Sequence, residues 1–171
     1  MAKSSLEDMV TGSHFAPIIP PSCKKPKRIN RVVLCSGQVY YTLERARTLN
    51  RLDNVALIRI EQLSPLPYSL LIEELDRYPM EAEIVYCQEE PYNLGPFPYV
   101  STRLEKALSI FSKKHANKKL IFAGRKPTGA VATGFKNLHV QQEFDLIALA
   151  LTGSSNAVVE SISAGSPLWS K

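Results

Sequence analysis

The sequence predicts a three-layer α/β domain, in which a mostly parallel sheet of four to five strands carries helices on both faces. Two observations predict this class. Short apolar runs, several of them rich in β-branched residues, alternate along the chain with stretches whose apolar residues have helical spacing. The 171 residues, of which 44% are hydrophobic and 22% charged, are enough for one globular domain and a modest tail.

Four apolar runs predict the strands. RVVLC is β-branched and ends at the turn Ser36-Gly37, and VALIRI is closed by EQLSPLP, whose two prolines end the strand. EIVYCQ is stopped by Pro91, and KLIFAG precedes a loop of Gly, Thr and Pro. The predicted strands are therefore 31–35, 55–60, 83–88 and 119–124.

Helical spacing of apolar residues predicts a helix after each of these strands, with right-handed crossovers between parallel strands. The first helix covers 39–49 and the second about 68–78. The loop PYNLGPFPYV leads into the third helix, whose apolar face is Leu104, Ala107, Leu108 and Phe111. The last helix places one stripe of apolar residues along its length: Val140, Phe144, Ile147, Ala148 and Leu151.

The two ends of the chain differ from this α/β domain, which spans 31–151. Prolines at positions 17, 20, 21 and 26 predict that residues 1–30 form an irregular arm, although HFAPIIP is apolar enough to lie against a surface. Residues 152–171 are rich in serine and predict a mobile tail. Residues 1–30 lack an apolar signal core and carry two acidic residues, so we expect no targeting signal in this chain.

Cysteine content and charge exclude several classes of protein. The three cysteines are odd in number and show no CxxC spacing, which favours a reducing compartment over a disulfide framework. No run approaches the roughly 18 apolar residues of a membrane span. The net charge of +5 comes largely from two lysine-rich groups in a linker and a loop, without interleaved aromatics, so we expect no nucleic-acid partner.

Polar residues follow each predicted strand. Because the carboxyl ends of parallel strands meet at one edge of the sheet, we expect these residues to converge on a common rim, where ligands and partners bind. The four groups are Ser36-Gly37, Glu61-Gln62, Gln88-Glu89-Glu90 and Gly124-Arg125-Lys126.

Two kinds of site are candidates on this rim. Ser36 and Gly37 at a helix start, with Arg125 and Lys126 opposite, could bind a phosphate or carboxylate, although a simple helix cap also explains Ser36. Glu89 and Glu90 are adjacent on a strand and point to opposite faces, which disfavours an acid/base pair.

Ion pairing is the expected role of these two carboxylates. We expect an ion pair of Glu89 or Glu90 with Arg125 or Arg59, or a place for the rim carboxylates, Glu61 included, at an interface. A small enzyme that uses Glu89 or Glu90 would need a deep pocket around them.

No autonomous active site is predicted. His14, His115 and His139 lack metal-binding spacing, so we expect no metal site. Cys35 and Cys87 lie in apolar strands and are expected to be buried thiols. The chain contains no GxxxxGK[ST], GxGxxG or GxSxG motif.

Four segments, in order, carry a resemblance to a known family: RVVLCSGQVYY, VALIRIEQLSPLPY, VYCQEEPYNLGPFPYV and AGRKPTGAVATG. Together with the arm SSLEDMVTGSHFAPIIP they resemble the C-terminal end of the decarboxylating component of 2-oxoglutarate dehydrogenase. A sister family active on 2-oxoadipate is similar here. The resemblance implies a transketolase-C-terminal-like fold in an enzyme of the tricarboxylic acid cycle that uses thiamine diphosphate and Mg²⁺. It places those cofactors in upstream domains, so this piece alone is expected to be inactive.

The resemblance also implies partners and a compartment. The partners are the upstream catalytic domains, a homodimer mate and a lipoyl-bearing acyltransferase component, in the mitochondrial matrix or a bacterial cytoplasm. Some family members have an acyl-coenzyme A regulatory site in this domain. Arg125 and Lys126 are the best candidates for it, with Gln88 and Arg47 as neighbours. The rival hypothesis is a free-standing anion- or nucleotide-binding module built on the same rim.

Overall fold

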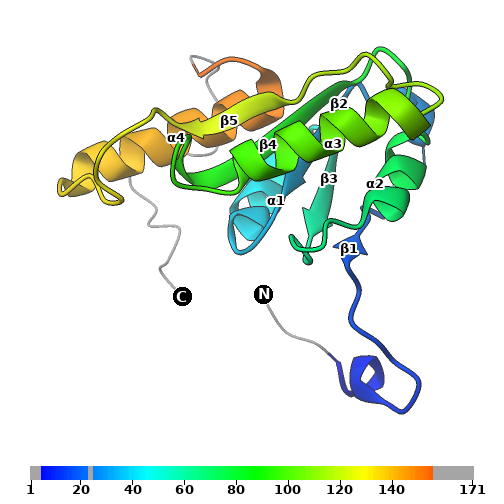
Figure 1. Ribbon diagram of the computed structural model, residues 1–171. Coiled ribbons are helices and arrows are strands. Elements are labelled where there is room, and N and C mark those ends of the chain that lie inside the picture. The colour runs from blue at the N-terminus through cyan, green and yellow to red at the C-terminus, as the bar shows by residue number, and fades with distance from the viewer. Residues whose placement is uncertain (1–4, 23–24, 156–171) are drawn as a thin grey trace.

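The protein forms a five-stranded sheet in the order β1-β3-β2-β4-β5 (Figure 1). The structure is a computed structural model that describes residues 5–22 and 25–155. Strands β2 to β5 are parallel, and β1 pairs with β3 in the antiparallel sense. The predicted fold class is confirmed. The strands are β1 Ile18–Ile19, β2 Arg31–Cys35, β3 Val55–Ile60, β4 Glu83–Pro91 and β5 Ile121–Arg125.

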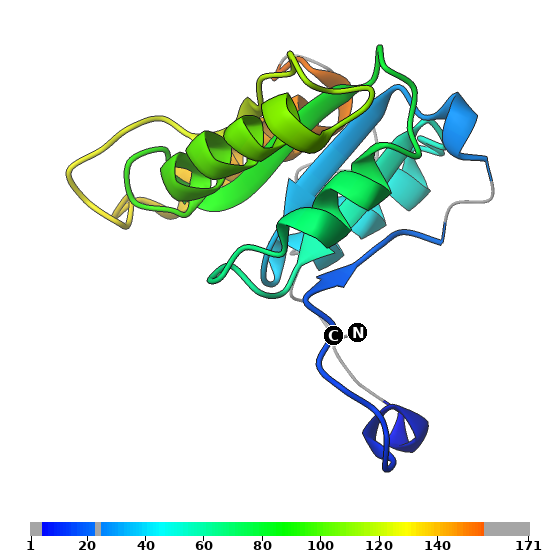
Figure 2. The same ribbon diagram turned by 45° about the vertical axis from the view of Figure 1, so that its right-hand side comes forward.

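Four helices cover the sheet, two on each face, which gives three layers (Figure 2). Helices α2 and α3 pack on one face, and α1 and α4 pack on the other. The helices are α1 Val39–Leu49, α2 Tyr68–Leu75, α3 Phe97–Phe111 and α4 Lys136–Thr152, and two short 3-10 turns are η1 Leu6–Met9 and η2 Pro26–Arg28.

Alternation of side chains along β2 divides the core into two halves. Val32 and Leu34 join the cluster under α2 and α3, whereas Val33 and Cys35 join the cluster under α1 and α4. All five residues of β2 are buried because both faces of the central strand are covered. Only the edges of the sheet are left for contact with solvent or a ligand.

Arg31 fixes the end of α4 to the start of β2. Its side chain is buried, donates from Nε to the carbonyl of Ala150 at 2.7 Å and from Nη2 to that of Leu149 at 2.9 Å, and forms an ion pair with Glu83. Both carbonyls belong to the last turn of α4, and that of Leu149 also accepts the backbone N–H of Gly153 at 3.0 Å. The guanidinium therefore ties the end of this helix to the start of β2.

Several boundaries differ from the predicted ones. Strand β4 runs on to Pro91, α2 ends at Leu75 rather than at residue 78, and β5 begins at Ile121. The predicted stripe on α4 is only partly correct. Residues 146–151 supply its buried side chains, whereas Val140 is exposed because the first half of α4 extends past the sheet (Figure 1).

The arm predicted to be irregular contributes a strand. Ile18 and Ile19 pair with Ile60 and Arg59, and the carbonyl of Pro17 accepts hydrogen bonds from the backbone N–H groups of Glu61 and Gln62. Strand β1 thus covers the free edge of β3. Residues 156–171 of the predicted tail lie outside the described residues, as does Cys23.

Candidate functional site

The rim at the carboxyl ends of the parallel strands brings together the four groups of polar residues that the sequence predicts. Cys35 is level with Arg59 on one side and with Cys87 on the other, and Cys87 is level with Ala123. The residues that follow these positions therefore share one edge. They are Ser36-Gly37, Glu61-Gln62, Gln88-Glu89-Glu90 and Arg125-Lys126.

The strand order places a topological switch point between β2 and β4. These strands are neighbours, yet α1 follows β2 on one face and α3 follows β4 on the opposite face. Such a point opens a crevice at the carboxyl ends of the strands, where α/β proteins bind ligands. Here Ser36 Oγ lies 3.3 Å from the hydroxyl of Tyr86, and Gly37 has a φ of 76°.

Ser36 is not the helix cap. Gln38 occupies the capping position of α1, and the Ser36 hydroxyl is taken up by Tyr86. Gly37 has the left-handed conformation that glycine adopts without strain, which turns the chain from β2 into α1.

Gln88 organises the loop after β4. Its side chain is 2% exposed, and its Oε1 accepts the backbone N–H of Phe97 at 2.9 Å. Its Nε2 donates to the carbonyls of Glu90 at 3.1 Å and Pro91 at 2.9 Å. A Cβ at Gly95 would collide with this amide, so the close approach requires glycine there. Gln88 is thus a positioning residue with every strong hydrogen-bonding group in use.

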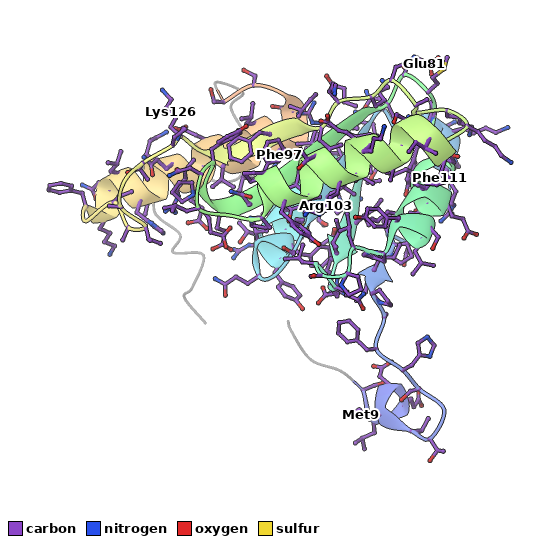
Figure 3. All side chains as sticks on the ribbon, viewed as in Figure 1. Met9, Glu81, Phe97, Arg103, Phe111 and Lys126 are labelled. Carbon is purple, nitrogen blue, oxygen red and sulfur yellow. The ribbon has the colours of Figure 1, made fainter. Side chains whose placement is uncertain are left out.

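Aromatic rings close the same end of the sheet. Tyr92 lies 5.3 Å from Phe97 and 5.0 Å from Phe122, centroid to centroid, and Phe97 lies 4.9 Å from Phe122. Figure 3 labels Phe97 at the start of α3, next to the edge strand β5. The loop PYNLGPFP contains the signal for this cluster, but the contact with Phe122 is long-range and cannot be read from spacing.

The predicted ion pairs of Glu89 and Glu90 are wrong. Among the described residues, neither carboxylate lies within salt-bridge distance of Arg125 or Arg59. Burial, together with the carboxylates of Glu90 and Glu143, raises the pKa of Glu89, and Arg125 offsets only part of this rise.

Arg59 has other partners. It pairs with Glu61 at 3.8 Å, lies 4.5 Å from the centroid of the Tyr40 ring and donates to the Tyr41 hydroxyl at 3.4 Å. Arg59 and Glu61 lie two residues apart, so their side chains point to the same side of the chain. The partner of Glu61 is therefore Arg59, on the strand that precedes it.

Arg125 turns toward α4 instead. Its Nη2 lies 3.0 Å from His139 Nδ1, and because an arginine only donates, the imidazole nitrogen accepts. Arg125 Nε is buried and has no partner among the described residues. His139 has no sequence motif, but it lies on the first turn of the helix that follows β5 and packs on it.

Arg125 and Lys126 line an open hollow of about 640 Å³ between β5 and α4. Tyr92, Phe122 and Leu138 supply apolar walls. Lys126 is exposed and points away from the sheet (Figure 3).

Arg47 does not belong to this rim, contrary to the prediction that it neighbours Arg125. Helix α1 runs back across the sheet, so its last turn reaches the amino edge, where Arg47 Nη1 lies 3.5 Å from the carbonyl of Val55. There Arg47 pairs with Glu44 at 2.8 Å.

The buried thiols offer no nucleophile. Burial raises the pKa of Cys35 to about 12 and raises the pKa of Cys87 well above its usual value, whereas catalysis needs the thiolate. The described residues also contain no group of three His, Cys, Asp or Glu that could hold a metal ion. No described helix is long and apolar enough to cross a membrane.

Fold and rim together define a doubly wound α/β domain. A family described as 2-oxoglutarate dehydrogenase C-terminal matches residues 3–151. The chain belongs to this family.

Curated relatives agree with that match. The chain is 39% identical over 143 residues to a rat protein named 2-oxoglutarate dehydrogenase-like, mitochondrial, and 40% identical over 151 residues to the 2-oxoglutarate dehydrogenase, mitochondrial, of Caenorhabditis elegans. These alignments cover 81% and 86% of this chain, but in each case only 14% of the relative. The chain therefore spans about one seventh of the length of the relatives it matches.

A substitution of Gln88 tests whether its side chain organises the loop after β4. Replacing Gln88 with Leu leaves the Phe97 N–H without its acceptor in a buried place and removes the amide donor from the carbonyls of Glu90 and Pro91. We expect the free energy of unfolding, measured with urea, to fall by about 2–4 kcal/mol. Gln141→Leu on the exposed face of α4 is the control and should change it by less than about 0.5 kcal/mol. Equal effects of the two changes would show that Gln88 does not organise the loop.

Proposed function

We propose that this chain is a C-terminal assembly and regulatory domain of a thiamine-dependent 2-oxoglutarate dehydrogenase and does not catalyse by itself. The observation that carries the proposal is the family match over residues 3–151 in a chain that covers only 14% of its relatives. In the intact enzyme thiamine diphosphate supplies the chemistry of decarboxylation, and upstream domains hold it. The succinyl group then passes to a lipoyl arm on an acyltransferase component.

The surface supports a role in assembly. Large apolar side chains are exposed in the loop between β5 and α4, with Val131 70% and Phe135 74% exposed, and Leu138 follows on the first turn of α4. Contiguous exposed apolar residues mark protein–protein contacts. They adjoin the rim, so the same edge of the sheet can face the catalytic domains or a homodimer mate.

The names of the relatives also bear on where the protein is located in the cell and on the rival hypothesis of a free-standing binding module. Several are named mitochondrial, which supports a place in the mitochondrial matrix. The family describes the C-terminal part of a larger enzyme, so membership of it gives no support to a free-standing anion-binding module.

One ligand site accompanies this role. The hollow of about 640 Å³ combines apolar walls with Arg125 and Lys126, and the buried Arg125 Nε lacks a partner among the described residues. An acyl-coenzyme A has phosphates for the two cations and an apolar chain for the walls. We assign the hollow as the candidate regulatory site for such a ligand.

A chimera tests the assembly role. The segment of the C. elegans enzyme that aligns with this chain is replaced by residues 3–151 of the chain. Because the two sequences are 40% identical, we expect the chimera to assemble and to turn over 2-oxoglutarate within roughly tenfold of the parent. The parent with the segment deleted is the control and should lose activity. A chimera no more active than the deletion variant would contradict the proposal.

Calorimetry with acetyl-coenzyme A tests the ligand site. We expect Arg125→Gln to weaken binding about tenfold or more, because it removes a charge that contacts phosphate. Arg45→Gln, on an exposed turn of α1, is the matched control and should leave Kd unchanged. If both variants bind as the wild type does, the site lies elsewhere.

A further inference from the structure

The amino-terminal turn of the chain carries an apolar stripe that its own domain does not bury. Leu6 is 84% exposed, Met9 63% and Val10 59%. Leu6 and Met9 are three residues apart and lie on one side of the 3-10 turn, and Val10 follows at its end in an extended conformation. Phe15, 65% exposed, follows a few residues later. We call residues 5–16 the docking arm.

The docking arm stands away from the sheet. Figures 1 and 2 show η1 clear of the domain in both views, joined to it by the chain that leads into β1. Figure 3 labels Met9 on this turn, far from the rim and from the helices. No residue of η1 is buried. The stripe is therefore available to a partner.

The turn is nevertheless fully capped. Ser5 Oγ accepts the backbone N–H of Asp8 at 3.3 Å, and the Asp8 carboxylate accepts the backbone N–H of Ser5 at 2.8 Å. This capping box defines where the helical turn begins. One turn of helix is marginal in water without packing, because ordering its residues outweighs a single hydrogen-bonded turn. A capped turn with a bare apolar stripe is thus a shape suited to a groove on another body.

We propose that the docking arm lays Leu6, Met9 and Val10 into an apolar groove on the polypeptide that precedes this domain in the full-length enzyme. The inference rests on the proposed function and names the contact that joins the two parts. The family is a C-terminal one, and the aligned segment is 14% of the relatives' length, so most of each relative precedes the domain.

The point of attachment favours this partner over a second copy of the chain. The family match begins at residue 3, next to the docking arm, so in the relatives the preceding polypeptide continues directly from it. A tethered partner is present at a high effective concentration and loses little translational freedom on docking. Three apolar anchors suffice for such an intramolecular contact, whereas capture of a second molecule from solution needs a larger interface.

Hydrogen exchange tests the docking arm in two settings. Backbone amides of residues 5–16 are measured in the isolated 171-residue chain and in the chimeric enzyme. We expect at least tenfold slower exchange in the chimera, and the double variant Leu6→Ser, Met9→Ser should abolish this protection. The matched control is Glu7→Ser, which changes the opposite side of the same turn and should keep the protection.

As a control on folding, the double variant should leave the melting temperature of the isolated chain unchanged, since its side chains are exposed there.

The other outcomes decide between the interpretations. If the chimera is active but its docking arm exchanges as fast as in the isolated chain, the proposed contact of the docking arm is wrong. The proposed function of the domain is not affected by that result. Protection that appears in the isolated chain and rises with its concentration assigns the groove to a second copy and overturns the inference. An inactive chimera removes both proposals.

Discussion

Burial of the central strands on both faces is the constraint on which the rest of the structure depends. Val32 and Leu34 pack under α2 and α3 while Val33 and Cys35 pack under α1 and α4, so β2 has no face left for a ligand. Any chemistry is confined to the carboxyl edge. At that edge Gln88 fixes the loop after β4, and the rings of Tyr92, Phe97 and Phe122 pack against one another.

The predictable parts of the fold are those set by local sequence. Strands β2 to β5 follow from their apolar runs, since β2, β3 and β4 are largely buried between the helices and β5 buries Ala123 at the edge of the sheet. Strand β1 could not be predicted, since two isoleucines are too few for a pattern and only pairing with Ile60 and Arg59 defines it. The start of α3 at Phe97 depends on the side chain of Gln88, nine residues earlier. Such contacts leave no periodic signal.

For the site residues, too, what local sequence sets was predictable and what long-range contacts set was not. Convergence of the strand ends follows from parallel pairing alone, and it was predictable. The partners of the charged residues were not predictable, because they depend on how the helices pack. Arg125 contacts His139 on α4, and Arg47 lies at the opposite edge of the sheet because α1 runs back across it. The surfaces proposed for contact with partners lie outside the core. The docking arm and the apolar loop before α4 can contact a partner without contributing to the stability of the domain, so changes there should separate assembly from folding.

The measurement that tests the central claim most directly is carbon dioxide release by the isolated chain supplied with thiamine diphosphate, Mg²⁺ and 2-oxoglutarate. Because the proposal places the cofactor in upstream domains, it predicts a rate equal to that of the buffer, at any concentration of protein. Release above that rate, abolished by Glu89→Gln, would contradict the account, because it would place a working catalytic centre inside this domain.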